Sequence, residues 1–178
     1  MNLWEKCVAF HGHSCPGLAI GFRTVEAAQK WLGLVGFSQD EELVCVSEND
    51  ACGIDAVQVL LGCSTGKGNL IHKDMGKQAF SFFDRKNNKK GRIVYKHPFS
   101  PNIQREELQK NILSTPLEEL FELKMPDFEV PIQAKIFKSI QCEKCGESAM
   151  EQKMRLEDGK KLCLDCASAY TRGWGRLL

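Results

Sequence analysis

The start of the chain carries apolar residues at helical spacing in two separate segments. A stripe that repeats every three to four positions predicts a short helix over residues 2–10, which Gly12 ends. A longer helix follows, because Pro16 suits a first helical position and the apolar stripe then continues as far as Gly33. The two helices are separated by the polar stretch HGHSCPG.

The middle of the chain alternates between strand and helix patterns. The compact apolar run LVCVS at 43–47 predicts a buried strand, after which Asp50 is expected to cap a helix that stops at Gly62. The segments 79–83 and 92–96 flank the polar sequence DRKNNKKG and predict a hairpin. The basic cluster between them fits a solvated hairpin tip.

Two further helices and an extended connection complete this region. Residues 102–113 predict an amphipathic helix, and Thr115 with Glu118 has the spacing of a capping box for a shorter one. The two prolines in 125–131 indicate an extended segment. Interspersed helices and strands favour an α+β class, with a mixed β-sheet flanked by helices over residues 1–135 and a small second domain at 136–178.

Composition narrows the class of protein. The 178 residues have a net charge of +1, which gives no general attraction to nucleic acid or to anionic membranes. No apolar run reaches the ~18 residues of a membrane span, and the first residues lack the basic and apolar regions of a signal peptide. We therefore expect a cytoplasmic protein without a membrane partner.

Nine cysteines are many for a chain of this length. In a reducing compartment, clustered thiols are more often metal ligands or reactive groups than disulfides. The cysteines fall into a scattered set in the first two-thirds of the chain and a compact set near its end. The scattered set is Cys7, Cys15, Cys45, Cys52 and Cys63, and the compact set is Cys142, Cys145, Cys163 and Cys166.

The compact set forms two Cys-x-x-Cys pairs, CEKC at 142–145 and CLDC at 163–166. Each pair brings two thiolates to one ion, and two pairs complete a closed tetrahedral shell for structural zinc. Asp158-Gly159 between them predicts a hairpin turn, and the residues after Cys166 have a helical pattern. We expect a treble-clef or zinc-ribbon finger, with two redox-active Cys-x-x-Cys motifs as the alternative.

The charge of this finger does not select its partner. From Lys135 onward there are nine Lys/Arg and six Asp/Glu, and a zinc tetrathiolate adds a charge of −2, which leaves about +1. A protein contact or a stabilising role is therefore at least as well supported as nucleic-acid binding.

The stretch HGHSCPG contains a second candidate site. Cys15 precedes a proline, so it is expected at the N-cap of the following helix, where free N–H groups stabilise a thiolate. If the segment is extended, His11, His13 and Cys15 project to one side. Imidazole and thiolate are good ligands for zinc or another transition metal. The alternative is a solvated loop.

Cys52 repeats this arrangement at the start of the next helix, directly after the strand 43–47. The two cysteines are expected to face each other beside the strand ends, where ligands usually bind in α/β folds. The alternative is that Cys15 and Cys52 are buried core residues without a function, as we expect for Cys7 and Cys45. The sequence pattern does not assign Cys63 either to a site or to the core. It also shows no partner residues for His72 and His97.

The stretch GCSTGKG at residues 62–68 resembles a phosphate-binding loop but does not fit one. Only three residues separate Gly62 and Gly66, no Ser or Thr follows Lys67, and the loop comes after a helix instead of a strand. We interpret it as a turn and leave open whether Gly62–Gly68 contacts an anion.

Two stretches, FHGHSCPGLAIGFR at 10–23 and ENDACGIDAVQVLLGCSTGKGNL at 48–70, resemble the FmdE family, named for its association with molybdenum formylmethanofuran dehydrogenase. The resemblance implies a thioredoxin-like α+β core, a homodimer, and in some members a C-terminal zinc finger. It also implies a functional cluster, because His11, His13, Cys15 and Cys52 match the family's motif. It supplies no reaction.

Three functions are consistent with these features. The first is a metal-binding accessory or regulatory protein, with a second zinc or other transition metal in the core and a finger that contacts a partner enzyme or regulatory protein. The second is a thiol- or metal-dependent enzyme in which Cys15 or Cys52 acts beside His13. The third is a nucleic-acid-binding regulator acting through the finger.

Overall fold

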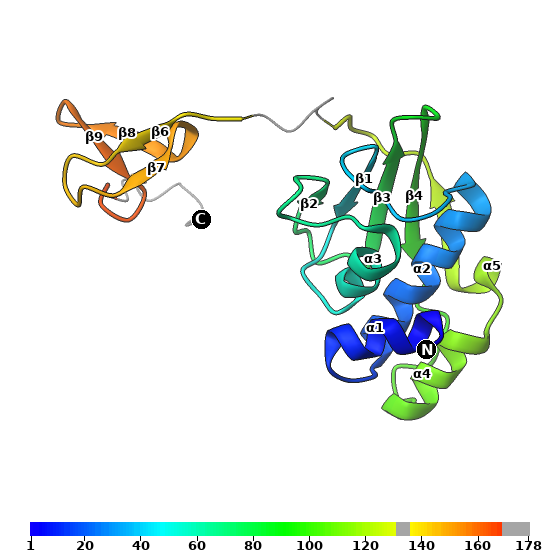
Figure 1. Cartoon of the computed structure of the whole chain (residues 1–178). Helices are drawn as coiled ribbons and strands as arrows, with labels where there is room; N and C mark the ends of the chain where they lie inside the picture. Colours follow the sequence, from blue (N-terminus) through cyan, green and yellow to red (C-terminus); the bar gives the residue numbers. More distant parts are fainter. Residues whose placement is uncertain (131–135, 169–178) are drawn as a thin grey trace. The chain divides into compact units, whose positions relative to one another are not determined.

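The computed structural model describes residues 1–130 and 136–168. The chain divides into two compact units, Met1–Ala134 and Lys135–Leu178 (Figure 1). The first unit holds a mixed α+β fold, as predicted, and the second holds the four-cysteine cluster. No helix among the described residues is long and apolar enough to cross a bilayer.

A single five-stranded sheet forms the centre of the first unit, in the order β2-β1-β3-β4-β5. The pair β1–β2 is parallel and the other three pairs are antiparallel, so the sheet is mixed. The predicted strand at 43–47 and the predicted hairpin are both confirmed. The strands are β1 (Leu43–Ser47), β2 (Leu70–His72), β3 (Ala79–Asp84), β4 (Lys89–Tyr95) and β5 (Phe121–Lys124).

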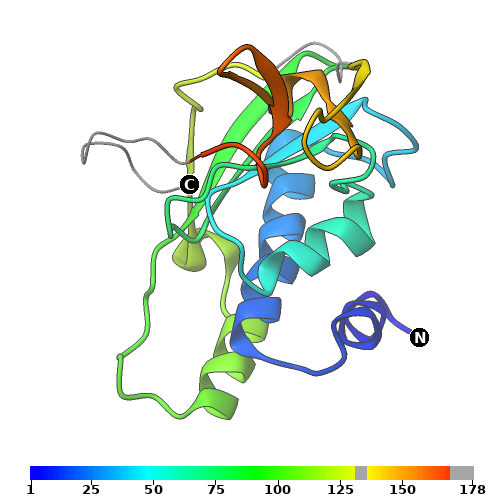
Figure 2. The same ribbon diagram turned by 90° about the vertical axis from the view of Figure 1, so that its left-hand side faces the viewer.

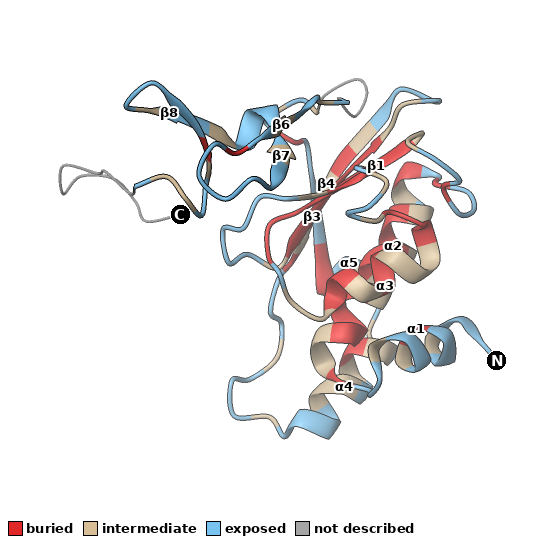
Figure 3. Ribbon diagram, turned by 60° about the vertical axis from the view of Figure 1, so that its left-hand side comes forward, coloured by how far each residue is buried: buried red, intermediate tan, exposed pale blue. Residues whose placement is uncertain are grey.

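The helices lie on one side of this sheet (Figures 1 and 3). The helix α2 packs on β4 and α3 packs on β1, while α1 packs on α3 and α4 lies along the first part of α2 (Figure 2). The helices are α1 (Leu3–His11), α2 (Pro16–Leu32), α3 (Gly53–Leu61), α4 (Arg105–Ser114) and α5 (Leu117–Leu120).

The two faces of the sheet follow the two-residue period of its strands. Phe80 and Phe82 point to the helices and are fully buried there, where they join the main core. Val44, Val46 and Phe83 point to the opposite face and form a smaller cluster, which the segment after β5 covers. The sheet is therefore buried on both faces near β1 and β3.

Close packing of α2 against α3 determines where the candidate core site lies. Gly21 and Gly53 meet backbone to backbone, because a Cβ on Gly21 would lie 2.1 Å from the carbonyl oxygen of Gly53. Only glycine permits such an approach. The contact brings the amino-terminal ends of the two helices together, and Cys15 and Cys52 stand at those ends.

Two of the predicted helix starts are wrong. Asp50 does not cap α3, which begins at Gly53 with Cys52 in the N-cap position. The side chain of Asn49 instead accepts the N–H of Ala51 at 3.1 Å, so the chain makes a polar turn before the helix starts. Asp50 itself is exposed.

The predicted capping box at Thr115 is also wrong. The N-cap of α5 is Pro116, with no side-chain hydrogen bond, and the carboxylate of Glu118 lies 2.6 Å from Lys30. The edge strands β2 and β5 have no counterpart in the predicted elements.

The second unit consists of two small hairpins. One joins β6 (Ser139–Gln141) to β7 (Ser148–Met150), and after the turn η1 (Glu151–Lys153) the other joins β8 (Met154–Glu157) to β9 (Lys160–Cys163). The predicted turn at Asp158-Gly159 is confirmed, with φ of 47° and 79° at the two residues. Most of the helix expected after Cys166 lies outside the described residues.

Candidate metal centres

The stretch HGHSCPG forms a tight connection between α1 and α2 and is not an extended strand. His11 is the last residue of α1, and Gly12 ends the helix in the left-handed region, with φ of 88°. Its N–H donates to the carbonyl of Val8 at 2.8 Å. The turn, and not the alternation of an extended chain, therefore directs the side chains of this stretch.

His11, His13 and Cys15 nevertheless converge. Each offers one donor atom, and the three atoms all lie within 4.8 Å of one another. The two imidazole rings are 4.5 Å apart between centroids, and Cys15 Sγ lies 3.8 Å from His11 Nε2. Donors around a tetrahedral zinc ion stand about 3.3–3.8 Å apart, given Zn–N of about 2.0 Å and Zn–S of about 2.3 Å. Small side-chain movements would bring these donors to such an ion.

A carboxylate on α3 orients the first of these ligands. Asp55 Oδ2 lies 2.6 Å from His11 Nδ1, and the other oxygen of Asp55 accepts the side-chain amide of Gln58 at 3.1 Å. With Nδ1 occupied, Nε2 of His11 is left to face Cys15. Metal-binding histidines generally have such an outer partner, which fixes the ring and raises its basicity. The sequence prediction missed Asp55, although it is the one acidic residue in a mostly apolar helix.

Cys15 occupies the N-cap of α2, as predicted. Its thiol is buried, and Sγ accepts the backbone N–H of Leu18 at 3.3 Å, while Pro16 takes the first helical position. The Leu18 N–H and the positive end of the 17-residue helix thus both face this sulfur. Cys15 is therefore positioned as a candidate metal ligand.

Cys52 lies beside Cys15 but outside the group of three. A Cβ built on Gly17 would be 3.2 Å from Cys52 Cβ and 4.0 Å from Cys15 Sγ, so the two cysteines border the same glycine. Burial, and then the hydrogen bond and charge of Cys15, raise the pKa of the Cys52 thiol. Two neighbouring thiols ionise together only when a cation neutralises them.

One member of the group, His11, lines a cleft of about 400 Å³ on the side of α3. His11, Cys52 and Asp55 form one wall, and Thr65 and His72 belong to the loop and strand that form another. His72 Nε2 lies 3.5 Å from Thr65 Oγ1, so His72 has a place at the cleft that the sequence did not indicate.

His97 lies elsewhere and plays no part in either cysteine cluster. Its ring makes an edge contact with Tyr95, with centroids 4.6 Å apart.

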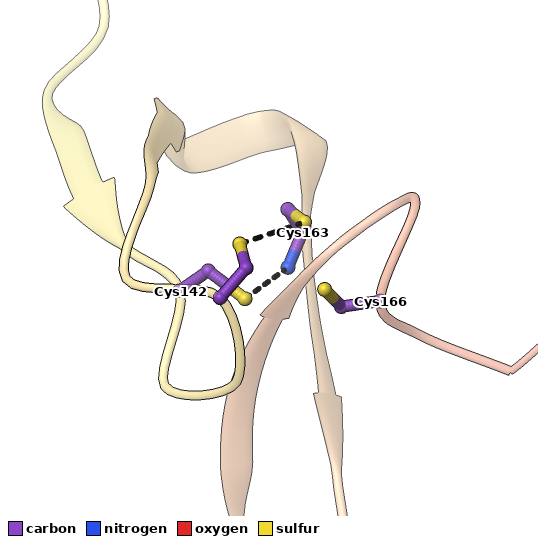
Figure 4. Close-up of side chains that lie close together, drawn as sticks. Cys142, Cys163 and Cys166 are labelled. Carbon is purple, nitrogen blue, oxygen red and sulfur yellow. Dashed lines mark hydrogen bonds between the residues drawn. The ribbon is translucent and has the colours of Figure 1, made fainter.

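In the second unit, the four cysteines of the Cys-x-x-Cys pairs lie together. Their Sγ atoms are all within 4.8 Å of one another, and Cys142, Cys163 and Cys166 point toward a common space in Figure 4. Cys145 Sγ lies 3.9 Å from Cys163 Sγ, and the N–H of Cys163 donates to Cys142 Sγ at 3.3 Å. The two Cys-x-x-Cys pairs thus form one shell of four sulfur donors.

The electrostatics of this shell favour a bound cation. Backbone N–H groups, first that of Cys145 and then that of Cys163, lower the pKa of Cys142 to about 6. Hydrogen bonding to Cys163 and burial raise the pKa of Cys166 to about 12. The shell on its own holds some thiols ionised and others protonated, whereas a divalent ion would ionise all four. Four sulfur donors in this arrangement fit zinc.

The remaining cysteines belong to the hydrophobic core. Cys7, Cys45 and Cys63 are fully buried. Burial raises the pKa of Cys7 to about 11 and that of Cys63 to about 12, and it also raises the pKa of Cys45. These thiols are neutral packing groups, as predicted for Cys7 and Cys45, and Cys63 joins them.

The loop at residues 62–68 follows α3 and uses its lysine for a structural contact. Lys67 Nζ donates to the carbonyl of Ser38 at 2.8 Å and lies 5.3 Å from the centroid of the Phe37 ring. This contact supports the interpretation of the loop as a turn.

Together, the mixed α+β core, its His/Cys cluster and the four-cysteine unit define a protein with two groups of metal-binding residues. Residues 10–125 match the family described as "FmdE, Molybdenum formylmethanofuran dehydrogenase operon", so the chain belongs to the FmdE family. Residues 135–172 match the family described as "Prokaryotic dksA/traR C4-type zinc finger".

Two individual proteins are similar to the chain. A protein of Archaeoglobus fulgidus, described as "Probable S-adenosyl-L-methionine-binding protein", is 33% identical over 206 aligned residues, which cover 98% of this chain and 55% of the relative. The chain therefore spans about half the length of that relative. The crystal structure of a tungsten formylmethanofuran dehydrogenase FmdE-like protein from Syntrophus aciditrophicus superposes with a TM-score of 0.65 at 25% identity, covering 90% of this chain and 88% of that one.

Proposed function

We propose that this protein is a metal-binding accessory or regulatory protein. A transition metal, zinc in the first instance, is held in the core by His11, His13 and Cys15, with Cys52 as the neighbouring fourth donor. A second zinc stabilises the four-cysteine finger, which is then free to contact a partner protein. Homodimer formation and a cytoplasmic location remain predictions from the family resemblance and the sequence.

The observation that carries the proposal is the convergence of His11, His13 and Cys15 within 4.8 Å, with His11 oriented by Asp55. Two imidazoles and a thiolate form a donor set suited to zinc or a similar borderline metal. The Asp55–His11 contact adds the outer partner that metal-binding histidines generally have. A metal bound there would supply Lewis acidity at the cleft beside α3.

The accessory role is better supported than thiol catalysis. A nucleophilic cysteine needs a lowered pKa, whereas burial and Cys15 raise the pKa of Cys52, the thiol that borders the cleft. The Archaeoglobus relative is described as binding S-adenosyl-L-methionine, but it is about twice as long as this chain. Since the residues gathered here are metal donors, that ligand is not part of the proposal.

Metal content of the full-length protein, purified without oxygen and without added chelator, tests the proposal. We expect two metal ions per chain, of which one is lost in His13→Ala and in Cys15→Ala. The other is lost in Cys145→Ala. His97→Ala serves as the matched control, because His13 and His97 are both exposed and only His13 belongs to the cluster. One ion per chain, unchanged by the core substitutions, would refute the core site.

A further inference from the structure

A groove of about 410 Å³ lies on the face of the sheet opposite the helices, beside the carboxyl ends of β1 and β2. The cross-strand register places Arg92 next to Ser81 on β3, and Ser81 next to Val46 on β1, so these residues share that face. None of the residues that line the groove belongs to either cysteine cluster. Its charged lining consists of Glu48, Lys73, Lys77, Arg92, Lys124 and Asp127.

Arg92 is held rigidly at this groove by a buried carboxylate. Its Nε and Nη2 donate to the two oxygens of Glu48 at 2.5 and 2.8 Å, and the side chains of Arg92 and Glu48 are 16% and 6% exposed. In residues 1–130 and 136–168, no partner contacts Nη1 of Arg92. A guanidinium fixed along one edge keeps its other N–H groups oriented for a further oxyanion.

The backbone carbonyl of Glu48 also anchors the loop that carries Lys77. This carbonyl accepts the N–H of Met75 at 2.9 Å and the N–H of Lys77 at 3.0 Å, which anchors the loop after β2. Lys73, at the start of that loop, places its ammonium 4.2 Å from the centroid of the Phe128 ring. Within the described part of the chain, neither lysine forms a salt bridge.

The charges of the groove do not cancel. Four cationic groups face two carboxylates, and the carboxylate of Glu48 is already used by Arg92. Lys124 pairs with Glu122 at 3.0 Å, which leaves Lys73 and Lys77 as the cations opposite Asp127. The hydroxyl of Ser81, fully buried beside Arg92, has no hydrogen-bond partner among the described residues. The fixed ion pair of Arg92 and Glu48, with the exposed Lys73 and Lys77 beside it, leaves one net positive charge at the groove, which suits a compact anion.

We propose that this groove binds a phosphate group, either free or carried by a small monoester. The free edge of Arg92 would receive two phosphate oxygens, and Lys73 and Lys77 would balance the second charge. A dianion fits better than a single carboxylate because two lysines without salt bridges stand beside the guanidinium. The site is independent of the metal proposal, since none of its residues belongs to either cysteine cluster.

A titration of the full-length protein with inorganic phosphate tests this site. Amide NMR spectra recorded at constant ionic strength should show saturable shifts at Lys73, Lys77, Arg92 and Lys124. We expect Lys73→Gln/Lys77→Gln to weaken binding about tenfold or more. The matched control is Lys6→Gln/Lys110→Gln, which removes the same charge from exposed positions on α1 and α4 and should leave the affinity unchanged. Both double variants should keep the metal content of the unsubstituted protein.

Three results would overturn the proposal. The first is the absence of saturable shifts in the groove. The second is an equal loss of affinity in the control variant, which would reduce the effect to general charge. The third is tighter binding of succinate than of phosphate, which would assign the groove to dicarboxylates. Because the lysines are exposed, their substitution tests the site without the folding cost of changing Arg92.

Discussion

Asp55 Oδ2 lies 2.6 Å from His11 Nδ1, across 44 positions of sequence. The contact joins the end of α1 to the first turn of α3 and leaves His11 Nε2 directed at Cys15. It therefore connects helix packing to the orientation of a metal donor.

Removing this carboxylate should weaken the core site without abolishing it. We expect Asp55→Asn to lower core metal affinity about 10- to 100-fold, because the outer partner fixes the ring and raises its basicity. Competition with a chromophoric chelator measures the affinity. Asp50→Asn is the matched control, since Asp50 lines the same cleft without contacting His11 in the described structure. Equal losses in the two variants would mean that only the charge of the cleft matters.

The contact between α2 and α3 should tolerate no side chain. A Cβ on Gly21 would lie 2.1 Å from the carbonyl oxygen of Gly53, so Gly21→Ala should destabilise the fold by about 3 kcal/mol or more. The helix ends should separate as well, with loss of the core metal. Urea unfolding measures the change, and Gly66→Ala, at a position with open space around it, should be nearly neutral. A stable Gly21→Ala with full metal content would contradict this packing.

The buried ion pair between Glu48 and Arg92 predicts a loss of stability in acid. The hydrogen bond from Arg92 lowers the pKa of Glu48, so the stabilisation is complete above the unfolded-state pKa of about 4.3 and is lost as pH falls through the lower folded-state value. Glu48→Gln should cost about 3 kcal/mol at neutral pH. It should also reduce the slope of stability against pH below pH 4. Chemical denaturation of both proteins from pH 3 to pH 7 checks the two effects. If their free energies of unfolding changed in parallel with pH, the ion pair would not be the source of the acid sensitivity.

Folding of the finger should depend on bound zinc, whereas folding of the five-stranded sheet should not. Its hairpins bury few large side chains, Cys142 and Leu162 among them, so removing zinc should unfold residues 136–168. Strands β3, with the buried Phe80 and Phe82, and β4, with the buried Ile93, should keep their protection. Hydrogen exchange of the full chain, with and without a strong chelator, resolves the two regions. Protection of the finger that survives zinc removal would mean that it folds without metal.

Local signals were sufficient for much of the fold. The helices α1 and α2 were predictable because an apolar stripe ends at a glycine in each, and β1 was predictable from its compact apolar run. The N-cap role of Cys15 followed from the proline after it. The Cys-x-x-Cys pairs and Asp158-Gly159 were equally local features. All of these depend on residues close together in sequence.

Other features depend on packing that no short window contains. Asp55 meets His11 only after the glycine contact has positioned α3 against α2, and His72 reaches the cleft only once β2 pairs with β1. Asp50 has the chemistry of a cap, but Asn49 makes the turn because its side chain also donates to the carbonyl of Lys77. The edge strands were too short to show a period.

Anomalous diffraction at the metal absorption edge, from crystals of the full-length protein grown with its native metal, tests the central claim most directly. We predict two peaks per chain, one among the four cysteines of the finger and one bonded to His11 Nε2, His13 and Cys15 Sγ. A single peak, confined to the finger, in protein whose Cys15 and Cys52 remain reduced would contradict the account.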